Sequence, residues 1–204
     1  LNTELEMVVF DNSSSYKAHA GLFFGISTDN GGMYLEGDPS DANNTARFIA
    51  YEAEWLLPEF HIWNLTHEYV HYLDGRFNLK GDFSAAQTSS HKTVWWIEGL
   101  AEYISKKDFN DDAITLARTK EFELSTIFSN NYNSGQDRVY RWGYLAVRFM
   151  FENHQDKVNQ ILTLFRAGDY DNYLSYINGL GTSLDQQWRT WLDNVQSNEE
   201  PGMT

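Results

Sequence analysis

The 204-residue chain contains no cysteine, which excludes a disulfide scaffold, a cysteine nucleophile and thiolate metal ligands. Basic residues are also scarce. The chain has 15 lysines and arginines and 29 aspartates and glutamates, which gives a formal net charge of −14. Such an acidic chain lacks the cationic surface that binds nucleic acids or anionic membranes. Long apolar runs are missing too, so no segment is expected to span a bilayer.

Aromatic residues, by contrast, are abundant, with 7 tryptophans, 12 tyrosines and 13 phenylalanines. This much apolar surface excludes a disordered segment and supports one large or two small hydrophobic cores. The sequence starts at Leu1 rather than at a methionine. We therefore expect a domain taken from a longer protein, or a processed form.

Hydrophobic patterns predict strands in the first third of the chain and helices in the rest. Runs of β-branched and aromatic residues between polar turns predict strands at 5–10, 21–26, 33–36 and 46–52. From Pro58 onward, apolar residues recur at helical spacing, which predicts a helix over 58–74 that ends at Gly75. Further helices are predicted at 93–107, from Asp111, and at 136–153, 156–167 and 184–195. A small sheet joined to a helical half indicates the α+β class.

The most informative motif is His67-Glu68-Tyr69-Val70-His71. Two histidines at positions i and i+4 share one face of a helix, so both imidazoles can reach one zinc ion. Glu68 lies beside the first histidine, where it can accept a proton from metal-bound water. Chance would produce roughly 0.01 such matches in a chain of this composition, which favours a metal site over two surface histidines.

A catalytic zinc site needs a third protein ligand. A third histidine six residues after His71 is excluded, because Phe77 stands there. Glu98 follows His71 by 27 residues in a predicted helix and is the expected ligand. Glu102, one turn further on, could accept the outer N–H of a ligand histidine and fix its orientation. The alternative is that Glu98 and Glu102 are an ordinary pair of like charges on a helix.

Amide hydrolysis also needs a donor that stabilises the oxyanion of the tetrahedral intermediate. Tyr140 and Tyr144 flank Trp142-Gly143, and either hydroxyl could serve. The alternative for each tyrosine is a purely structural place in an aromatic core. In this scheme Glu68 accepts the proton of the attacking water and later delivers it to the leaving amine.

At this point the sequence resembles the peptidase domain of the bacterial collagenases, which are gluzincin zinc metallopeptidases. The resemblance rests on residues 67–77, on 95–102 and on 31–36, and it extends over nearly the whole chain. It implies a thermolysin-like fold, with an upper subdomain at 1–74 that carries a small mixed sheet and the active-site helix. A lower helical subdomain at 75–196 and a flexible tail at 197–204 would follow. The resemblance also implies zinc ligands His67, His71 and Glu98, with Glu68 as general base and acid.

Two further sites are implied by the resemblance. The double glycine Gly31-Gly32 would line the substrate cleft above the zinc, although these residues could also form a simple hairpin turn. A structural calcium would be bound by the carboxylate of Glu36 and by backbone carbonyls, for which the family positions correspond to Gly75, Phe77 and Leu79. Trp142 stands where many relatives have tyrosine, so the oxyanion donor stays open between Tyr140 and Tyr144.

These observations predict a secreted, extracellular and monomeric zinc endopeptidase with a structural calcium. Its expected substrates are collagen, gelatin and Gly-Pro-containing peptides, cleaved before glycine, and it is not expected to bind nucleic acid or membranes. Since family members carry an activator domain ahead of this one, we expect the segment alone to cut peptides and denatured collagen. The alternatives are a general gluzincin protease or aminopeptidase without collagen preference, and an inactive collagen-binding module.

Overall fold

The computed structural model describes residues 4–81 and 90–198 and divides into two compact units, Leu1–Gly75 and Arg76–Thr204. The first unit contains a three-stranded sheet, and the second is helical wherever it has regular structure in its described part. This combination confirms the α+β class. Among the described residues, no helix has both the length and the apolar composition that a membrane span requires.

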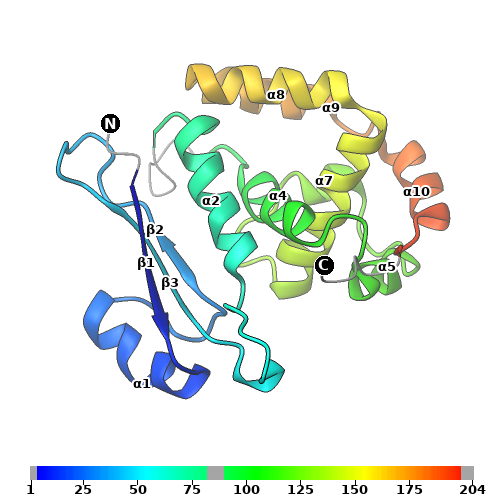
Figure 1. Ribbon diagram of the computed structural model, residues 1–204. Coiled ribbons are helices and arrows are strands. Elements are labelled where there is room, and N and C mark those ends of the chain that lie inside the picture. Colours follow the sequence, from blue (N-terminus) through cyan, green and yellow to red (C-terminus); the bar gives the residue numbers. More distant parts are fainter. Residues whose placement is uncertain (1–3, 82–89, 199–204) are drawn as a thin grey trace. The chain divides into compact units, whose positions relative to one another are not determined.

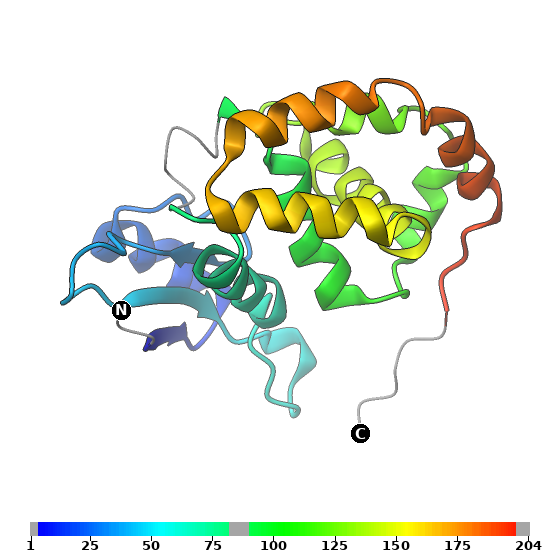
Figure 2. The same cartoon turned by 90° about the horizontal axis from the view of Figure 1, so that it is seen from above.

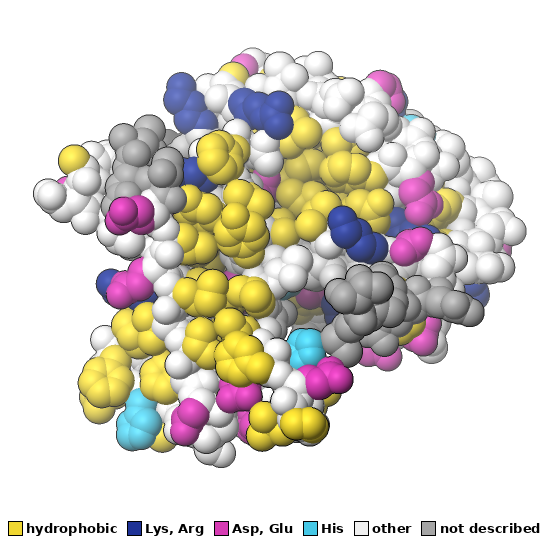
Figure 3. All heavy atoms as spheres, in the orientation of Figure 1, with side chains coloured by type: hydrophobic (Ala, Val, Ile, Leu, Met, Phe, Trp, Pro, Cys, Tyr) yellow, Lys and Arg dark blue, Asp and Glu magenta, His cyan; other side chains and the backbone are white. Residues whose placement is uncertain are grey.

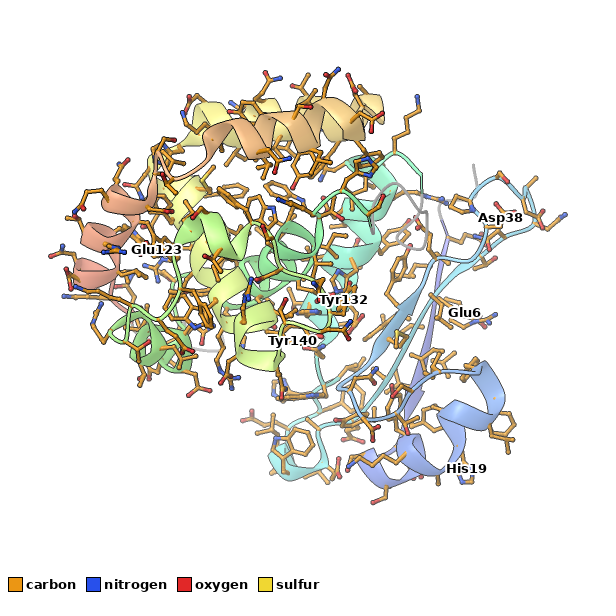
Figure 4. All side chains as sticks on the ribbon, turned by 180° about the vertical axis from the view of Figure 1, so that it is seen from behind. Glu6, His19, Asp38, Glu123, Tyr132 and Tyr140 are labelled. Atoms are coloured by element: carbon orange, nitrogen blue, oxygen red, sulfur yellow. The ribbon has the colours of Figure 1, made fainter. Side chains whose placement is uncertain are left out.

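The sheet of the first unit is mixed and has the strand order β1-β3-β2 (Figure 1). β1 (Leu5–Phe10) pairs in parallel with β3 (Ala46–Tyr51), and β2 (Met33–Leu35) pairs antiparallel with β3. The central strand is also the most buried of the three, since Phe48, Ile49 and Ala50 are almost completely covered. At one edge, Glu6 on β1 forms an ion pair with Arg47 on β3 (Figure 4).

A helix takes the place of one predicted strand. Residues 21–26 were expected to be extended, but α1 (Ser13–Phe24) runs through most of them. Asn12 caps this helix by accepting a hydrogen bond from the amide of Ser15 at 2.8 Å. A parallel β1–β3 pair needs a crossover connection, and α1 supplies it. The prediction was wrong because the apolar run that ends at Phe24 forms the last turn of a helix, where Leu22 and Phe23 are exposed.

The helix that carries the histidine motif begins later than predicted. α2 spans Leu65–Phe77 rather than 58–74, and Gly75 lies inside it instead of ending it. The residues before it pair with the end of β3, since Ala53 donates its amide to His61 and Trp63 donates to Tyr51. Pro58 therefore belongs to a looped segment and not to the first turn of the helix.

Hydrophobic side chains are exposed on this unit, as Figure 3 shows, among them Leu57, Phe60 and Trp63.

The second unit is built from helices around an aromatic core. Its helices are α4 (Val94–Lys106), α5 (Asp111–Ala117), α6 (Leu124–Ile127), α7 (Trp142–Asn153), α8 (Gln155–Ala167), α9 (Tyr170–Leu180) and α10 (Asp185–Asn194). α4 packs against α7, and α8 lies alongside α9 (Figure 2). The largest fully buried side chains include Trp95, Trp96, Trp142, Phe149, Phe165, Tyr173 and Trp188.

Several details of the helical unit differ from the sequence expectations. α6 and α9 were not predicted, and the predicted helix at 136–153 begins with a π-helical turn at Asp137–Arg141. The cap of α5 is Asn110 rather than Asp111, because its side chain accepts from the amide of Ala113. Of the predicted tail, Ser197 and Asn198 are described, and they bond to Asn110 and to Asp108.

Candidate metal centre

The two histidines of the motif lie one turn apart on α2, as the i, i+4 spacing predicts. Their Nε2 atoms are 3.0 Å apart and their ring planes are nearly perpendicular, at 87°. Both rings are buried, although they are among the most polar side chains of the helix. A buried pair of imidazoles with converging nitrogens is a typical arrangement for binding a metal ion.

Glu98 lies on α4 in the second unit, where it is surrounded by residues that are all buried from Val94 to Glu102. A buried carboxylate needs hydrogen-bond donors or a cation to offset its loss of hydration. The hydroxyl of Tyr132 donates to Oε1 of Glu98 at 2.9 Å. Glu102, one turn along α4, has the ammonium group of Lys106 at 3.5 Å.

His67, His71 and Glu98 form one group of side chains that could hold a metal ion, and no other such group occurs within residues 4–81 and 90–198. Each offers one ligand atom, and these atoms lie within 4.8 Å of one another. Two nitrogens bound to one tetrahedral zinc would be separated by about 3.3 Å, given zinc–nitrogen distances near 2.0–2.1 Å. The 3.0 Å separation of the two Nε2 atoms is close to this value. The donor set of two imidazoles and one carboxylate therefore fits zinc.

Glu68 is also buried, and its surroundings in the first unit are well defined. The side-chain amide of Asn64 donates to Oε1 of Glu68 at 3.1 Å. Tyr16 lies near enough for the charge of Glu68 to affect it, because burial and then this carboxylate raise the pKa of the Tyr16 phenol to about 12. Tyr16 consequently stays protonated, and it donates its hydroxyl to Asn30 at 2.6 Å.

The double glycine lies close to α2 and to the segment before it, with Gly31 near Trp63 and Gly32 near Glu68. Neither residue has the positive φ angle that a tight turn would demand of glycine. What they need is space, because a Cβ on Gly31 would lie 2.5 Å from Nε1 of Trp63, and one on Gly32 would lie 3.2 Å from the carbonyl oxygen of Ile49. Gly31 and Gly32 are therefore glycines of close approach. Their predicted contact with substrate remains a prediction.

Among the candidate oxyanion donors, Tyr144 is occupied elsewhere. Its fully buried hydroxyl donates to the carbonyl of Lys107 at 2.9 Å and accepts from Arg148 at 3.1 Å. Burial also raises the pKa of Tyr144. These contacts give it a structural role, which leaves Tyr140, in the π-helical turn, as the predicted donor. Tyr132 and Tyr140 are both labelled in Figure 4.

The predicted calcium ligands have the following environments. Glu36 is buried, and its carbonyl accepts from the side-chain amide of Asn44 at 2.8 Å. Gly75 and Phe77 belong to the last turn of α2, whose carbonyls have no partner further along the helix. Leu79 is buried and follows that helix. A calcium ion bound by these residues remains a prediction.

Two side chains that were not predicted, Asn64 and Tyr132, contact the candidate catalytic carboxylates. Tyr132 lies in a polar loop whose position relative to α4 no periodicity indicates. The signal for Asn64 was its position four residues before Glu68, the spacing at which helical neighbours meet.

Comparison with known proteins identifies the class of molecule to which this site belongs. The model of peptidase family M9, described as collagenase, matches residues 1–191. A "Microbial collagenase" of Vibrio alginolyticus is 48% identical over 202 residues, which cover 98% of this chain and 24% of that protein. A "Microbial collagenase" of Vibrio vulnificus is 44% identical over 199 residues, with the same coverage. "Collagenase ColA" of Clostridium perfringens is 24% identical over 210 residues, covering 95% of this chain and 18% of that protein.

The chain therefore belongs to the collagenase family of peptidases, M9. It spans about a quarter of the length of the Vibrio relatives that it matches. The resemblance inferred from the histidine motif is thus confirmed at the level of the family.

Proposed function

We propose that this chain is the catalytic domain of a zinc-dependent collagenase, and that it hydrolyses peptide bonds in collagen-type chains. The observation that carries the proposal is the group formed by His67, His71 and Glu98, with Glu68 next to the first histidine, in a chain of the M9 family. We further propose a thermolysin-like arrangement, for which the histidine motif on a helix that follows a small sheet is the support.

Each residue of the proposed site has its own role in peptide hydrolysis. His67, His71 and Glu98 would hold the zinc ion, and Glu102 would orient one of the histidines by accepting its outer N–H. Zinc bound there supplies a Lewis acid and lowers the pKa of water toward neutrality. Glu68 accepts the proton of the attacking water at its free carboxylate oxygen and delivers it to the nitrogen of the leaving amine. Tyr140 donates its hydroxyl to the oxyanion.

The sheet supports the proposal that the substrate is an extended peptide. β2 is an edge strand, because it pairs with β3 on one side only in the order β1-β3-β2. An extended peptide can add to such an edge through backbone hydrogen bonds. Gly31 and Gly32 directly precede β2 and carry no side chains, so a crowded collagen-type chain could approach closely there. We therefore propose collagen, gelatin and Gly-Pro-containing peptides as substrates, with cleavage before glycine.

Further parts of the proposal follow from the family and from the composition. A calcium ion bound by Glu36 and by the carbonyls of Gly75, Phe77 and Leu79 would stabilise the end of α2. We propose that the protein that contains this domain is secreted and acts on extracellular collagen, and that the domain is a monomer.

The experiment that tests the proposal is peptide hydrolysis by the purified 204-residue chain with its metal content measured. The chain should contain about one zinc per molecule and should cut a Gly-Pro-containing peptide in preference to casein. A chelator should abolish cleavage, and added zinc should restore it. Glu68→Gln should keep the metal and lose at least ~10³-fold in kcat, in line with the size of general acid–base effects.

Glu121→Gln is the matched control, because Glu121 is an exposed glutamate of the second unit. This variant should retain full activity and metal content. The proposal would be refuted if the zinc-loaded chain cut neither substrate, or if Glu68→Gln kept its activity. Equal cleavage of casein and the Gly-Pro peptide would refute the collagen preference alone.

A further inference from the structure

Asn64 has an unusual backbone conformation directly before the active-site helix. Its φ angle is +60°, in the left-handed region that residues with a Cβ rarely adopt. Asparagine tolerates this region better than most residues, because its short polar side chain can bond locally. The other non-glycine residues with positive φ within the described chain are lysines, namely Lys92, Lys107 and Lys120.

The conformation of Asn64 directs both its backbone and its side chain at Glu68. Its carbonyl accepts the backbone amide of Glu68 at 3.1 Å, and its side-chain amide donates to Oε1 of Glu68, also at 3.1 Å. Glu68 is only 5% exposed, so a donor on its carboxylate matters more than it would in water. Because the bond from Asn64 holds Oε1, it restricts rotation of the carboxylate.

Gly32 lies near the stem of the Glu68 side chain. An added Cβ on Gly32 would lie 3.2 Å from the carbonyl of Ile49 and 3.4 Å from Cγ of Glu68, and the second distance is an ordinary contact. The bond from Asn64 is therefore the contact that restrains the carboxylate itself.

We propose that Asn64 is a positioning residue for catalysis, whose amide aims the carboxylate of Glu68 at the attacking water. This inference rests on the proposed peptidase function and on the role given there to Glu68. With Oε1 engaged by Asn64, Oε2 is the oxygen that takes the proton. A misplacement of about 1 Å in a catalytic group can cost about 10²-fold in rate. Loss of the Asn64 amide should therefore lower kcat by about 10- to 100-fold.

Two substitutions separate this role from a purely structural one. Asn64→Gly removes the amide but suits the φ angle of +60° better than asparagine does, so the backbone gain should offset part of the cost of the lost hydrogen bond and the variant should still fold. Asn64→Asp keeps the size and local bonding of the side chain but places an acceptor against Oε1 of Glu68. Both variants should keep their zinc and a KM within about threefold, while kcat falls by about 10- to 100-fold.

Lys107→Gly is the matched control, because it relieves a φ angle of +53° at an exposed helix end of the second unit. Its kcat, KM and zinc content should equal those of the parent chain. All four proteins are assayed as full 204-residue chains, with a Gly-Pro-containing peptide, and their unfolding temperatures and zinc contents are measured alongside.

The outcomes distinguish a failure of the proposed peptidase function from a failure of the positioning role of Asn64. If the parent chain itself shows no zinc-dependent cleavage, the proposed function fails. If the parent chain is active and Asn64→Gly keeps its kcat, the positioning role is overturned while the proposed function stands. The positioning role is also overturned if Asn64→Gly loses zinc together with activity, because Asn64 would then support the histidine pair rather than Glu68.

Discussion

Replacing Gly99 by alanine should show how closely the helix that carries Glu98 packs in its own unit. Gly99 faces α7, and a Cβ added to it would lie 2.7 Å from the carbonyl carbon of Gly143 and 2.8 Å from Cγ2 of Val147. Two of the nearest three atoms belong to the backbone of α7, so no side-chain rotation can relieve the clash. The carbonyl oxygen of Gly143 would be closer still, so the two helices would have to separate by roughly 1 Å to restore ordinary contact distances.

Two opposing effects set the expected magnitude. Overpacking a well-filled interior costs about 1–3 kcal/mol, and a clash with backbone belongs at the upper end of that range. Alanine favours the helical conformation over glycine by about 1 kcal/mol. The net loss should be about 2 kcal/mol, which corresponds to a fall of about 4–8 °C in the unfolding temperature of a chain of this size.

Two other helical glycines serve as internal controls. At Gly143 the nearest atom to an added Cβ is 3.4 Å away, an ordinary contact, and at Gly179 nothing lies within 4 Å. Gly143→Ala should be close to neutral, and Gly179→Ala should raise stability by about 0.5–1 kcal/mol. Thermal unfolding followed by tryptophan fluorescence measures all three. The α4–α7 packing described here would be refuted if Gly99→Ala were as stable as Gly179→Ala.

Three more predictions concern the candidate site and the stability of the fold. Glu98→Ala should lose bound zinc on dialysis. Tyr132→Phe should keep zinc with about 10-fold weaker affinity, because the tyrosine orients a ligand without being one. Competition with a chelator measures both zinc affinities, and unchanged affinities would refute the assignments. Gly31→Val should impair cleavage of collagen-type peptides but lower the unfolding temperature only slightly, because the exposed indole of Trp63 can move aside. A large loss of both activity and stability would favour a purely structural role for this glycine. Burial, with a smaller contribution from Lys157, lowers the pKa of His154, so this residue should stabilise the fold less as the pH falls below its unfolded value of about 6.5. His154→Asn should flatten the decline of the unfolding free energy with falling pH below that value, and an unchanged slope would contradict the prediction.

The fold class could be predicted from the sequence because the hydrophobic period changes within the chain. β1 and β3 were predicted nearly to the residue, since runs such as 46–52 are rich in aromatic and branched side chains. The end of α8 at Ala167 was predicted to the residue, and the glycine that follows it, Gly168, adopts a left-handed φ of +72°. These features depend on local sequence alone.

Errors arose where tertiary contacts override local preference. The run that ends at Phe24 has strand-like composition, but α1 is required to connect two parallel strands. Pro58 would suit the first turn of a helix, yet the segment that follows it bonds back to the end of β3, where Trp63 donates its amide to the carbonyl of Tyr51. The helix α9 was missed because its polar and small residues weaken the apolar stripe, although Tyr173 and Ile177 are buried.

Parts of the candidate site could likewise be predicted from local sequence, and other parts could not. The histidine pair could be predicted, because the spacing of His67 and His71 on a helix fixes the direction of both rings. Glu98 could also be chosen as the third member, because it follows His71 by 27 residues on a later predicted helix, and the family resemblance implied the same residue. Of the partners of the carboxylates, Asn64 stands at the four-residue spacing before Glu68, whereas Tyr132 lies in a loop that no periodicity places near Glu98.

The two candidate catalytic carboxylates are supported in the same manner, each within its own unit. Glu68 accepts a hydrogen bond from Asn64, and the stem of its side chain lies against Gly32. Glu98 accepts one from Tyr132, and the next residue, Gly99, lets α4 approach the backbone of α7. In each case a neutral donor holds one oxygen of the carboxylate. A carboxylate held by a charged donor would be a weaker base and a weaker ligand, because the positive charge would compete for its electrons. Neutral donors therefore orient the two carboxylates without that loss.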